Sequence, residues 1–288
     1  MRHLQIPVRM QSPIRIQTPV RIQILVRGVL ACGLFLPSLA AQRIDYPTAG
    51  VPRTPDGKPN LTAACPRTAD GKPDLSGLWE TVHRSQAPPL NGCFPTAEEF
   101  GNIGHSFPEG LPFQPWAAEL VAKRAPEGRI HDPITNCLPA GVIRMHTHPL
   151  VKKVIQTAGL VVILNELYAS YRQIFTDGRP LPVDPNPSWN GYSSGKWEGD
   201  TLVVQTIGFR DGIWLDGAGS PLTDAAKITE RFRRPDFGHL EIEITVDDPK
   251  AYNKPWTVKL NQTIKLDTDL LDYICQEGER DVQHLVVK

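Results

Sequence analysis

Two histidines separated by a single residue, His146 and His148, are the first candidates for chemistry in the sequence. On an extended segment, residues i and i+2 point to the same side, which is how β-barrel metal sites present imidazole ligands. A metal site would need a third ligand from His105, His131, His239 or a carboxylate, and none of these lies at a diagnostic spacing. A solvent-facing pair in a loop is the interpretation that this pattern favours.

Glu230 is the second candidate, because it lies in a segment that alternates like a β-strand. Ile228, Glu230 and Phe232 share one face, so an inward apolar face would carry the carboxylate into the protein. Burial would raise the pKa of this carboxyl group and suit it to general acid–base catalysis. The favoured alternative is a structural ion pair between Glu230 and an inward arginine such as Arg172.

Aromatic residues near the middle of the sequence predict a ligand site. Trp214 and Asp216 lie in a glycine-rich stretch between two strands, where the mouth of a barrel would place binding residues. Aromatic rings beside Asp and Arg side chains suit a sugar ring or an aromatic ligand. As alternatives, the tryptophans pack as core, and Asp177 and Arg179 form a hairpin turn and an ion pair. The candidate ligand-binding residues are Arg172, Asp177, Arg179, Trp189, Tyr192 and Trp214.

Missing motifs and the charge balance disfavour several function classes. The sequence contains no G-x-S-x-G elbow, phosphate-binding loop or dinucleotide fingerprint, so we expect neither an α/β-hydrolase nor a nucleotide cofactor. The chain has 31 basic and 31 acidic residues, and five arginines precede residue 42. Without them the balance is 26 to 31, a net charge of about −5, which is not the basic footprint of a nucleic-acid-binding protein. The sequence therefore predicts a small organic ligand and no nucleic acid.

Residues 1–41 have the pattern of a secretory signal peptide. Five arginines and no acidic residue accompany an apolar run from Gly28 to Ala40, which ends in Ser-Leu-Ala-Ala. The run is shorter than the roughly 20 residues that span a bilayer, which disfavours a transmembrane anchor. Cys32 loosely matches a lipoprotein cleavage site, but the apolar run continues past it. We expect export to the periplasm or beyond, with no transmembrane segment in the mature chain.

Four cysteines follow the predicted signal: Cys65, Cys93, Cys137 and Cys275. An oxidising compartment favours two disulfides, and four cysteines allow three connectivities. We expect Cys65 to pair with Cys93, both in the loop-rich N-terminal part, and Cys137 to pair with Cys275. The spacing matches neither a C-x-x-C redox motif nor a zinc ribbon, so the predicted role of all four is structural.

The candidate residues need a scaffold, and the pattern after residue 76 predicts one that is mainly β. Period-2 alternation is clear in 240–246 and 256–261, and turn sequences such as Glu198-Gly199-Asp200 join neighbouring segments. About nine short strands, from 76–82 to 270–275, favour an antiparallel meander closed into a lipocalin-like β-barrel over a two-sheet sandwich. The predicted domain spans 77–288, with short helices at 95–103 and 115–125 and a loop at 126–150.

A proline- and glycine-rich segment, residues 42–76, precedes the predicted barrel. It contains two related stretches, Arg53–Leu61 and Arg67–Leu75, which share the pattern Arg-Thr-x-Asp-Gly-Lys-Pro. Asp-Gly is turn chemistry, because aspartate bonds its own backbone and glycine adopts positive φ. We expect an extended arm laid over the domain, with a disordered stalk as the alternative.

Several motifs in the second half of the chain carry a resemblance to a known family. They include RQIFTDGRPLP at 172–182, GKWEGDTLVV at 195–204 and TERFRRPD at 229–236. Over roughly residues 70–288 the chain resembles a family of secreted, mostly uncharacterised bacterial proteins, which implies secretion and a lipocalin-like barrel but transfers no activity. Where relatives tend to have a histidine in a Gly-x-Pro-His motif, this chain has Leu222. If relatives use that histidine in catalysis, this protein uses another base or has a different activity.

The sequence thus predicts a secreted β-barrel that binds a small organic molecule, an aromatic or glycoside-like compound. The first alternative is a cofactor-independent lyase, isomerase or hydrolase in which Glu230, Asp216 and His148 act as acid–base residues in the barrel cavity. The second is an envelope interaction protein, which would present a large exposed apolar patch and no pocket.

Overall fold

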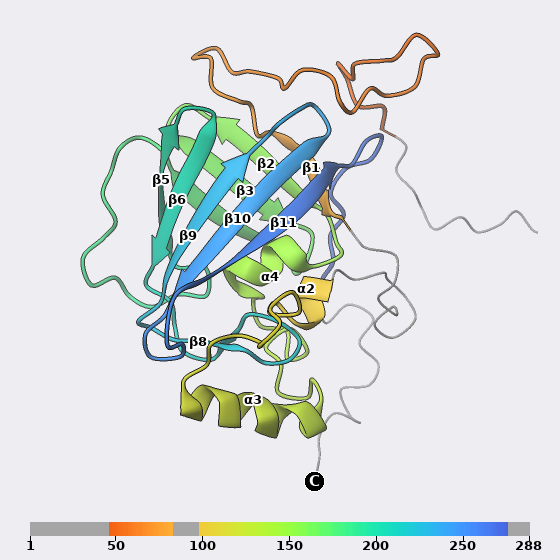
Figure 1. The fold of residues 1–288 in the computed structure, drawn as a ribbon. Helices are drawn as coiled ribbons and strands as arrows, with labels where there is room; N and C mark the ends of the chain where they lie inside the picture. The colour runs from red at the N-terminus through yellow and green to blue at the C-terminus, as the bar shows by residue number, and fades with distance from the viewer. Residues whose placement is uncertain (1–45, 83–97, 276–288) are drawn as a thin grey trace, which may run out of the picture. The chain divides into compact units, whose positions relative to one another are not determined.

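The computed structural model describes residues 46–82 and 98–275. Nine of the strands close into a barrel in the order β1-β11-β10-β9-β6-β5-β4-β3-β2 (Figure 1). The prediction of a mainly β protein built on a closed barrel is therefore confirmed. The predicted signal peptide at 1–41 lies outside the described residues.

The strands follow the alternation seen in the sequence. In β10, for example, Leu240, Ile242, Ile244 and Val246 are all buried in the barrel core. The segment 270–275, predicted as a strand, forms only an isolated bridge between Leu167 and Tyr273. The barrel strands are β1 (Gly77–Thr81), β2 (Lys152–Thr157), β3 (Leu160–Asn165), β4 (Ser170–Phe175), β5 (Tyr192–Glu198), β6 (Thr201–Ile207), β9 (Lys227–Arg233), β10 (His239–Asp247) and β11 (Trp256–Ile264), and a separate two-stranded sheet contains β7 (Ile213–Trp214) and β8 (Pro221–Leu222).

One junction of the barrel departs from the predicted antiparallel meander. Strands β4 and β5 run parallel and pair only through Ile174 with Ser193 and Phe175 with Ser194. Two parallel strands need a long connection, and the segment 176–191 provides it. Because the pairing starts at Ile174, the first half of β4 has no strand partner on this side, and the barrel wall opens there.

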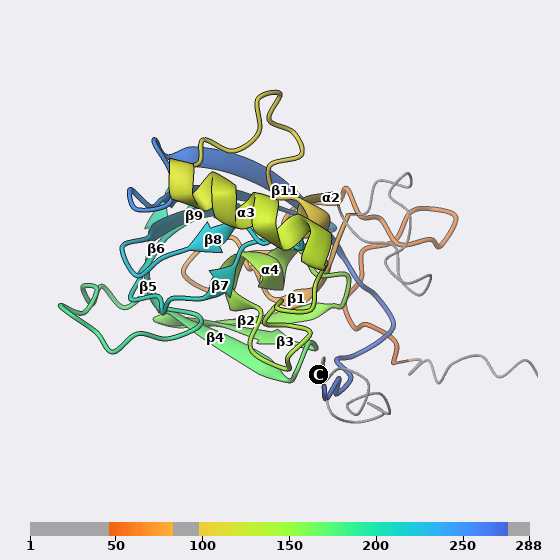
Figure 2. The same ribbon diagram turned by 90° about the horizontal axis from the view of Figure 1, so that it is seen from below.

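Three helices accompany the barrel: α2 (Glu98–Gly101), α3 (Pro115–Glu127) and α4 (Gly141–Thr147). Helix α3 matches the predicted helix, but α4 lies in a segment predicted as a loop. All seven residues of α4 are buried, and Figure 2 shows the helix surrounded by barrel strands, with α3 crossing in front of it. A segment placed inside a barrel cannot bond its backbone to water, so a helix that pairs these groups internally is the stable solution.

The arm, residues 46–76, repeats one local structure twice. Thr54 N–H donates to Lys58 O at 2.9 Å, and Thr68 N–H donates to Lys72 O at the same distance. Only the second copy has a charged partner on the barrel among the described residues, because Arg67 donates to both carboxylate oxygens of Asp200 at 2.9 and 2.7 Å.

Cys137 and Cys275 form a disulfide, as predicted. Cys65 forms no disulfide with any described residue. Its predicted partner, Cys93, lies outside the described ranges, so this second pairing stays a prediction. Within residues 46–82 and 98–275, no helix combines the length and the apolar character needed to cross a bilayer.

Candidate functional site

Glu230 lies inside the barrel, where the alternation of β9 placed it. Its carboxylate is fully buried and accepts a hydrogen bond from Arg172 Nη1 at 2.9 Å, and Arg172 Nη2 binds the second carboxylate oxygen. Arg172 comes from β4 and is itself 2 % exposed. The favoured interpretation of Glu230, a buried ion pair with Arg172, is confirmed by these contacts.

His146 adds a third member to this pair from α4. Its Nε2 lies 3.0 Å from Glu230 Oε1, and its ring is fully buried. Burial lowers the pKa of His146 to about 4, against the opposing pull of the Glu230 carboxylate. The neutral ring donates from Nε2 because a carboxylate can only accept. Its Nδ1 has no hydrogen-bond partner among the described residues.

The expectation that Glu230 has a raised pKa is wrong. Burial alone would raise the pKa of the carboxyl group, but the charge of Arg172 and the hydrogen bonds from His146 and Arg172 outweigh burial and lower the pKa. A carboxylate held ionised and bonded on both oxygens has no proton to give and no open lone pair directed at a ligand space. The geometry therefore does not support Glu230 as a general acid or base.

Further buried polar side chains, contributed by most barrel strands, surround α4 next to the Glu230, Arg172 and His146 contacts. Thr81 Oγ1 and Gln262 Nε2 donate to His146 O at 2.7 and 3.0 Å, and Lys152 Nζ donates to Gln262 Oε1. Helix α4 and these side chains fill this end of the barrel. We call the set the interior polar network; its members are Thr81, His146, Lys152, Asn165, Arg172, Ser193, Thr206, Glu230 and Gln262, all buried.

Neither interpretation of the histidine pair agrees with the structure: the two residues are not placed as a metal-binding pair, and the favoured solvent-facing pair in a loop is wrong because His146 is fully buried in a helix. The segment that carries the two histidines is not extended: His146 lies within α4, and His148 follows as its C-cap residue. His148 Nδ1 accepts a hydrogen bond from Leu150 N–H at 3.2 Å, and its ring packs edge-on against Phe100. Among the described residues, no group of three or more His, Cys, Asp or Glu side chains is arranged to hold a metal ion.

Asp216 and Trp214 also have structural surroundings. The Asp216 carboxylate is fully buried and accepts hydrogen bonds from Ile103 N–H and Ser220 N–H, both at 3.0 Å. Trp214 is 3 % exposed, and the Arg124 guanidinium lies 4.4 Å from its ring centre. This arrangement corrects the expectation that Asp216 and Trp214 line a barrel mouth: both fasten loops beneath the barrel.

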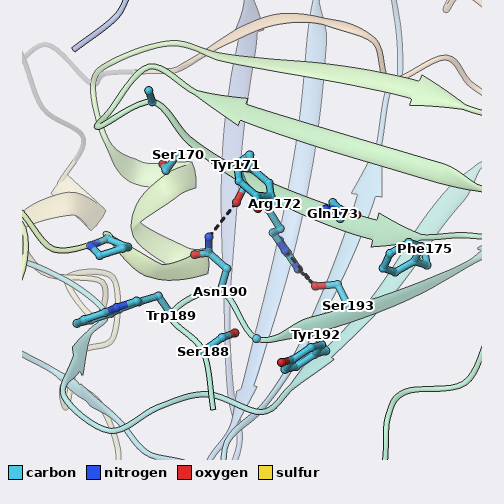
Figure 3. Close-up of a pocket in the computed structure, with 13 residues that line it drawn as sticks. Ser170, Tyr171, Arg172, Gln173, Phe175, Ser188, Trp189, Asn190, Tyr192 and Ser193 are labelled. Carbon is cyan, nitrogen blue, oxygen red and sulfur yellow. Dashed lines mark hydrogen bonds between the residues drawn. The ribbon is translucent and has the colours of Figure 1, made fainter. Parts of the chain in front are cut away.

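A pocket lies where β4 and β5 diverge, and we call it the β4–β5 pocket. It has a volume of about 580 Å³, within the range of roughly 300–1,000 Å³ that small-molecule sites occupy. Figure 3 shows its two sides, β4 on one and the segment that enters β5 on the other. Its lining consists of Pro139, Ala169, Phe175 and the stretches 170–173 and 188–193.

Four aromatic residues line this pocket: Tyr171, Phe175, Trp189 and Tyr192. Tyr171 is 61 % exposed and Tyr192 is 38 % exposed, so both rings are accessible to a ligand. The Arg210 guanidinium lies 4.7 Å from the Trp189 ring centre and supports that ring. Of the six predicted ligand-binding residues, Arg172, Trp189 and Tyr192 thus come together here.

Asn190 joins the two sides of the pocket. Its Nδ2 donates to Tyr171 O at 3.0 Å (Figure 3). This hydrogen bond fixes the orientation of the amide group and therefore the position of its oxygen, Oδ1. That oxygen is buried and has no hydrogen-bond partner among the described residues. An acceptor left in this state favours a ligand that can donate a hydrogen bond.

Asp177 and Arg179 lie beside the pocket. They form an exposed ion pair, in which Arg179 Nη2 is 2.6 Å from Asp177 Oδ2, as the turn interpretation predicted. The Arg179 guanidinium also lies 3.8 Å from the Phe175 ring centre. Arg179 lines a smaller hollow of about 220 Å³ with Phe175 and Tyr192, so it is a neighbour of the β4–β5 pocket.

Three polar residues of the pocket and the barrel interior were not predicted from the sequence: Asn190, Lys152 and Gln262. The alternation that placed Trp256, Val258 and Leu260 inward continues to Gln262, so this residue could have been found. Lys152 shares a face with Val154, but the apolar Ile155 on the other face hides the pattern. Nothing in the sequence around Asn190 shows that β4 lies across from it.

Comparison with known proteins gave no match: no protein-family model, no curated protein and no solved structure resembles the chain closely enough to be informative.

Proposed function

We propose that this protein binds a small organic molecule, aromatic or glycoside-like, in the β4–β5 pocket. The observation that carries the proposal is a pocket of about 580 Å³ lined by four aromatic residues and by Asn190, whose Oδ1 acceptor has no partner among the described residues. A few aromatic surfaces combined with a small number of directed polar groups are typical of small-molecule sites. The proposed site lies in the barrel wall and shares Arg172 and Ser193 with the interior polar network.

The proposal includes export and membership of the secreted family that the chain resembles. One stretch that carries the resemblance, residues 172–182, contributes Gln173 and Phe175 to the pocket. The Cys137–Cys275 disulfide supports an oxidising compartment. The enzyme alternative receives no support from its candidate residues, since Glu230 and Asp216 are fully buried and bonded within the protein.

Native mass spectrometry of gently purified protein tests the proposal. We expect an additional organic mass on the wild-type protein and on Trp116→Ala, and its loss from Trp189→Ala. Trp116 is a matched control, because it is 44 % exposed on α3 and does not line the pocket. A mass that stays bound to Trp189→Ala would place the ligand elsewhere. If no mass co-purifies and no compound of a phenolic and saccharide library raises the melting temperature, the binding function is wrong.

A further inference from the structure

We infer that the ligand of the β4–β5 pocket is a neutral sugar ring with several free hydroxyl groups. The inference rests on the proposed function and narrows its ligand class. Three properties of the pocket support it: its charge, its hydrogen-bonding groups and the exposure of its aromatic rings.

Among the described residues, Arg172 is the one charged residue in the pocket lining, and its charge is already neutralised. Both of its terminal nitrogens bind the Glu230 carboxylate, and Nε donates to Ser193 Oγ at 3.1 Å. A ligand carboxylate would have to compete with a buried ion pair, which is costly to break. No carboxylate of a described residue lines the pocket, so a cationic ligand would find no counter-charge and only the ring faces and neutral acceptors as partners. The lining therefore favours an uncharged ligand.

The pocket offers several neutral hydrogen-bonding groups. Besides Asn190 Oδ1, which has no partner within the described parts of the chain, the Gln173 amide and the hydroxyl groups of Ser188, Tyr171 and Tyr192 line the pocket. Amides and hydroxyls both donate and accept hydrogen bonds. A ring with several hydroxyl groups satisfies such a mixed set, whereas a phenyl ring would leave most of it unpaired.

The aromatic rings supply the complementary apolar contact. A sugar ring has a face of C–H groups that carry a small positive charge, and the face of an aromatic ring is negative. Tyr171 and Tyr192 border the pocket from opposite sides, one on β4 and one on β5 (Figure 3). An exposed tyrosine presents its ring and its hydroxyl group together, so it contacts both the C–H face and a hydroxyl group of one sugar.

Affinity electrophoresis tests this inference on the mature protein. Native gels would contain a neutral polysaccharide (β-glucan, arabinoxylan or galactomannan) or an anionic one (alginate or polygalacturonate). We expect retardation in at least one neutral gel, at an ionic strength of about 1 M as well as at low salt, because screening does not weaken uncharged contacts. Tyr171→Ala should weaken this binding by about tenfold or more, as the loss of an aromatic anchor does.

Tyr46→Ala is the matched control, since Tyr46 is 62 % exposed and lies in the arm, away from the pocket lining. It should be retarded like the wild-type protein. In parallel, p-coumarate and its uncharged methyl ester would be titrated by tryptophan fluorescence. Binding only to anionic polysaccharides or to these phenolic compounds, with loss in Tyr171→Ala, would overturn the sugar assignment while the pocket function stands. No retardation in any neutral gel, or equal weakening in both variants, would also overturn it, and native mass spectrometry decides the pocket function separately.

Discussion

The interior polar network and the β4–β5 pocket share Arg172 and Ser193 and differ in the kind of polar group they hold. Inside the barrel the charged groups are paired, because Glu230 is fully buried and bonded to Arg172 and His146, while the neutral Asn165 side chain has no partner among the described residues. In the pocket, the neutral Asn190 Oδ1 has no partner within the described residues, and the rings of Tyr171 and Tyr192 are partly exposed. Ionised groups buried without partners are costly, so they pair inside the protein, whereas neutral groups at an opening can stay unpaired until a ligand arrives.

This difference shows why titratable residues are a poor guide to the site in this protein. Of the residues that looked catalytic in the sequence, Glu230 is bonded to His146 of α4, and Asp216 accepts hydrogen bonds that fasten loops. The residues that could meet a ligand are mostly uncharged. Chemistry-bearing residue types therefore indicate structure here, and the proposed binding site lies at the open wall between β4 and β5.

The largest expected effect comes from removing the charge at the centre of the interior polar network. Glu230→Gln leaves the Arg172 guanidinium buried without its counter-charge, and the loss of one partner of a buried pair costs about 3–5 kcal/mol of unfolding free energy. Urea denaturation followed by circular dichroism measures it. Glu198→Gln is the control, because Glu198 makes comparable contacts with Arg231 at the barrel surface, where both side chains are more than 40 % exposed. Equal shifts of the two midpoints would contradict the comparison.

Lys152 leads to a second prediction for the interior polar network, which concerns how the unfolding free energy depends on pH. Burial lowers the pKa of Lys152 to about 7, below the usual value of about 10.4. Between these values the unfolded chain binds a proton that the folded protein does not, so the unfolding free energy rises with pH, by at most about 1.4 kcal/mol per pH unit. Lys152→Met should flatten this rise between about pH 7 and 9.

Lys153→Met is the matched control for this prediction, because the neighbouring Lys153 points outward, is 35 % exposed and pairs with Asp269. Its unfolding free energy should keep the wild-type slope with pH, measured by urea titration at fixed pH steps. A Lys152→Met protein with the wild-type slope would show that this lysine keeps its charge inside the barrel.

The sequence predicts the barrel well because strand burial is a local, alternating signal. Glu230, Ile228 and Phe232 share the inward face that their spacing indicates, and a carboxylate on that face favours a buried partner such as Arg172. Helix α4 was missed because it is buried on every side, and its β-branched residues Val142, Ile143 and Thr147 favour no helix by themselves. The pocket was missed because it depends on the parallel pairing of β4 and β5 across the long segment 176–191, which no local pattern encodes.

The two turns of the arm also separate what the local sequence determines from what the tertiary fold determines. Arg53 donates to Gly57 O at 2.7 Å and Arg67 donates to Gly71 O at 2.8 Å, so equal sequences give equal local structures. Only Arg67 also binds Asp200, at the hairpin that joins β5 to β6. Which copy is tied to the barrel is thus set by the tertiary fold, which places Asp200 beside one of them.

Substituting each arginine by alanine separates these two contributions and has the smallest expected effect. Both variants lose the bond to a glycine carbonyl oxygen, but Arg67→Ala also loses the surface pair with Asp200, and surface pairs contribute little to global stability. We therefore expect unchanged denaturation midpoints and a difference that is visible only in hydrogen exchange, which reports local opening. The amides of Thr68, Gly71 and Asp74 should exchange faster in Arg67→Ala than the equivalent amides of Thr54, Gly57 and Asn60 do in Arg53→Ala, each relative to the wild-type protein. Equal acceleration in both copies would mean that the Asp200 contact does not hold the arm, and that the backbone bonds from Phe237 and Gly238 to Ala63 and Leu61 are sufficient.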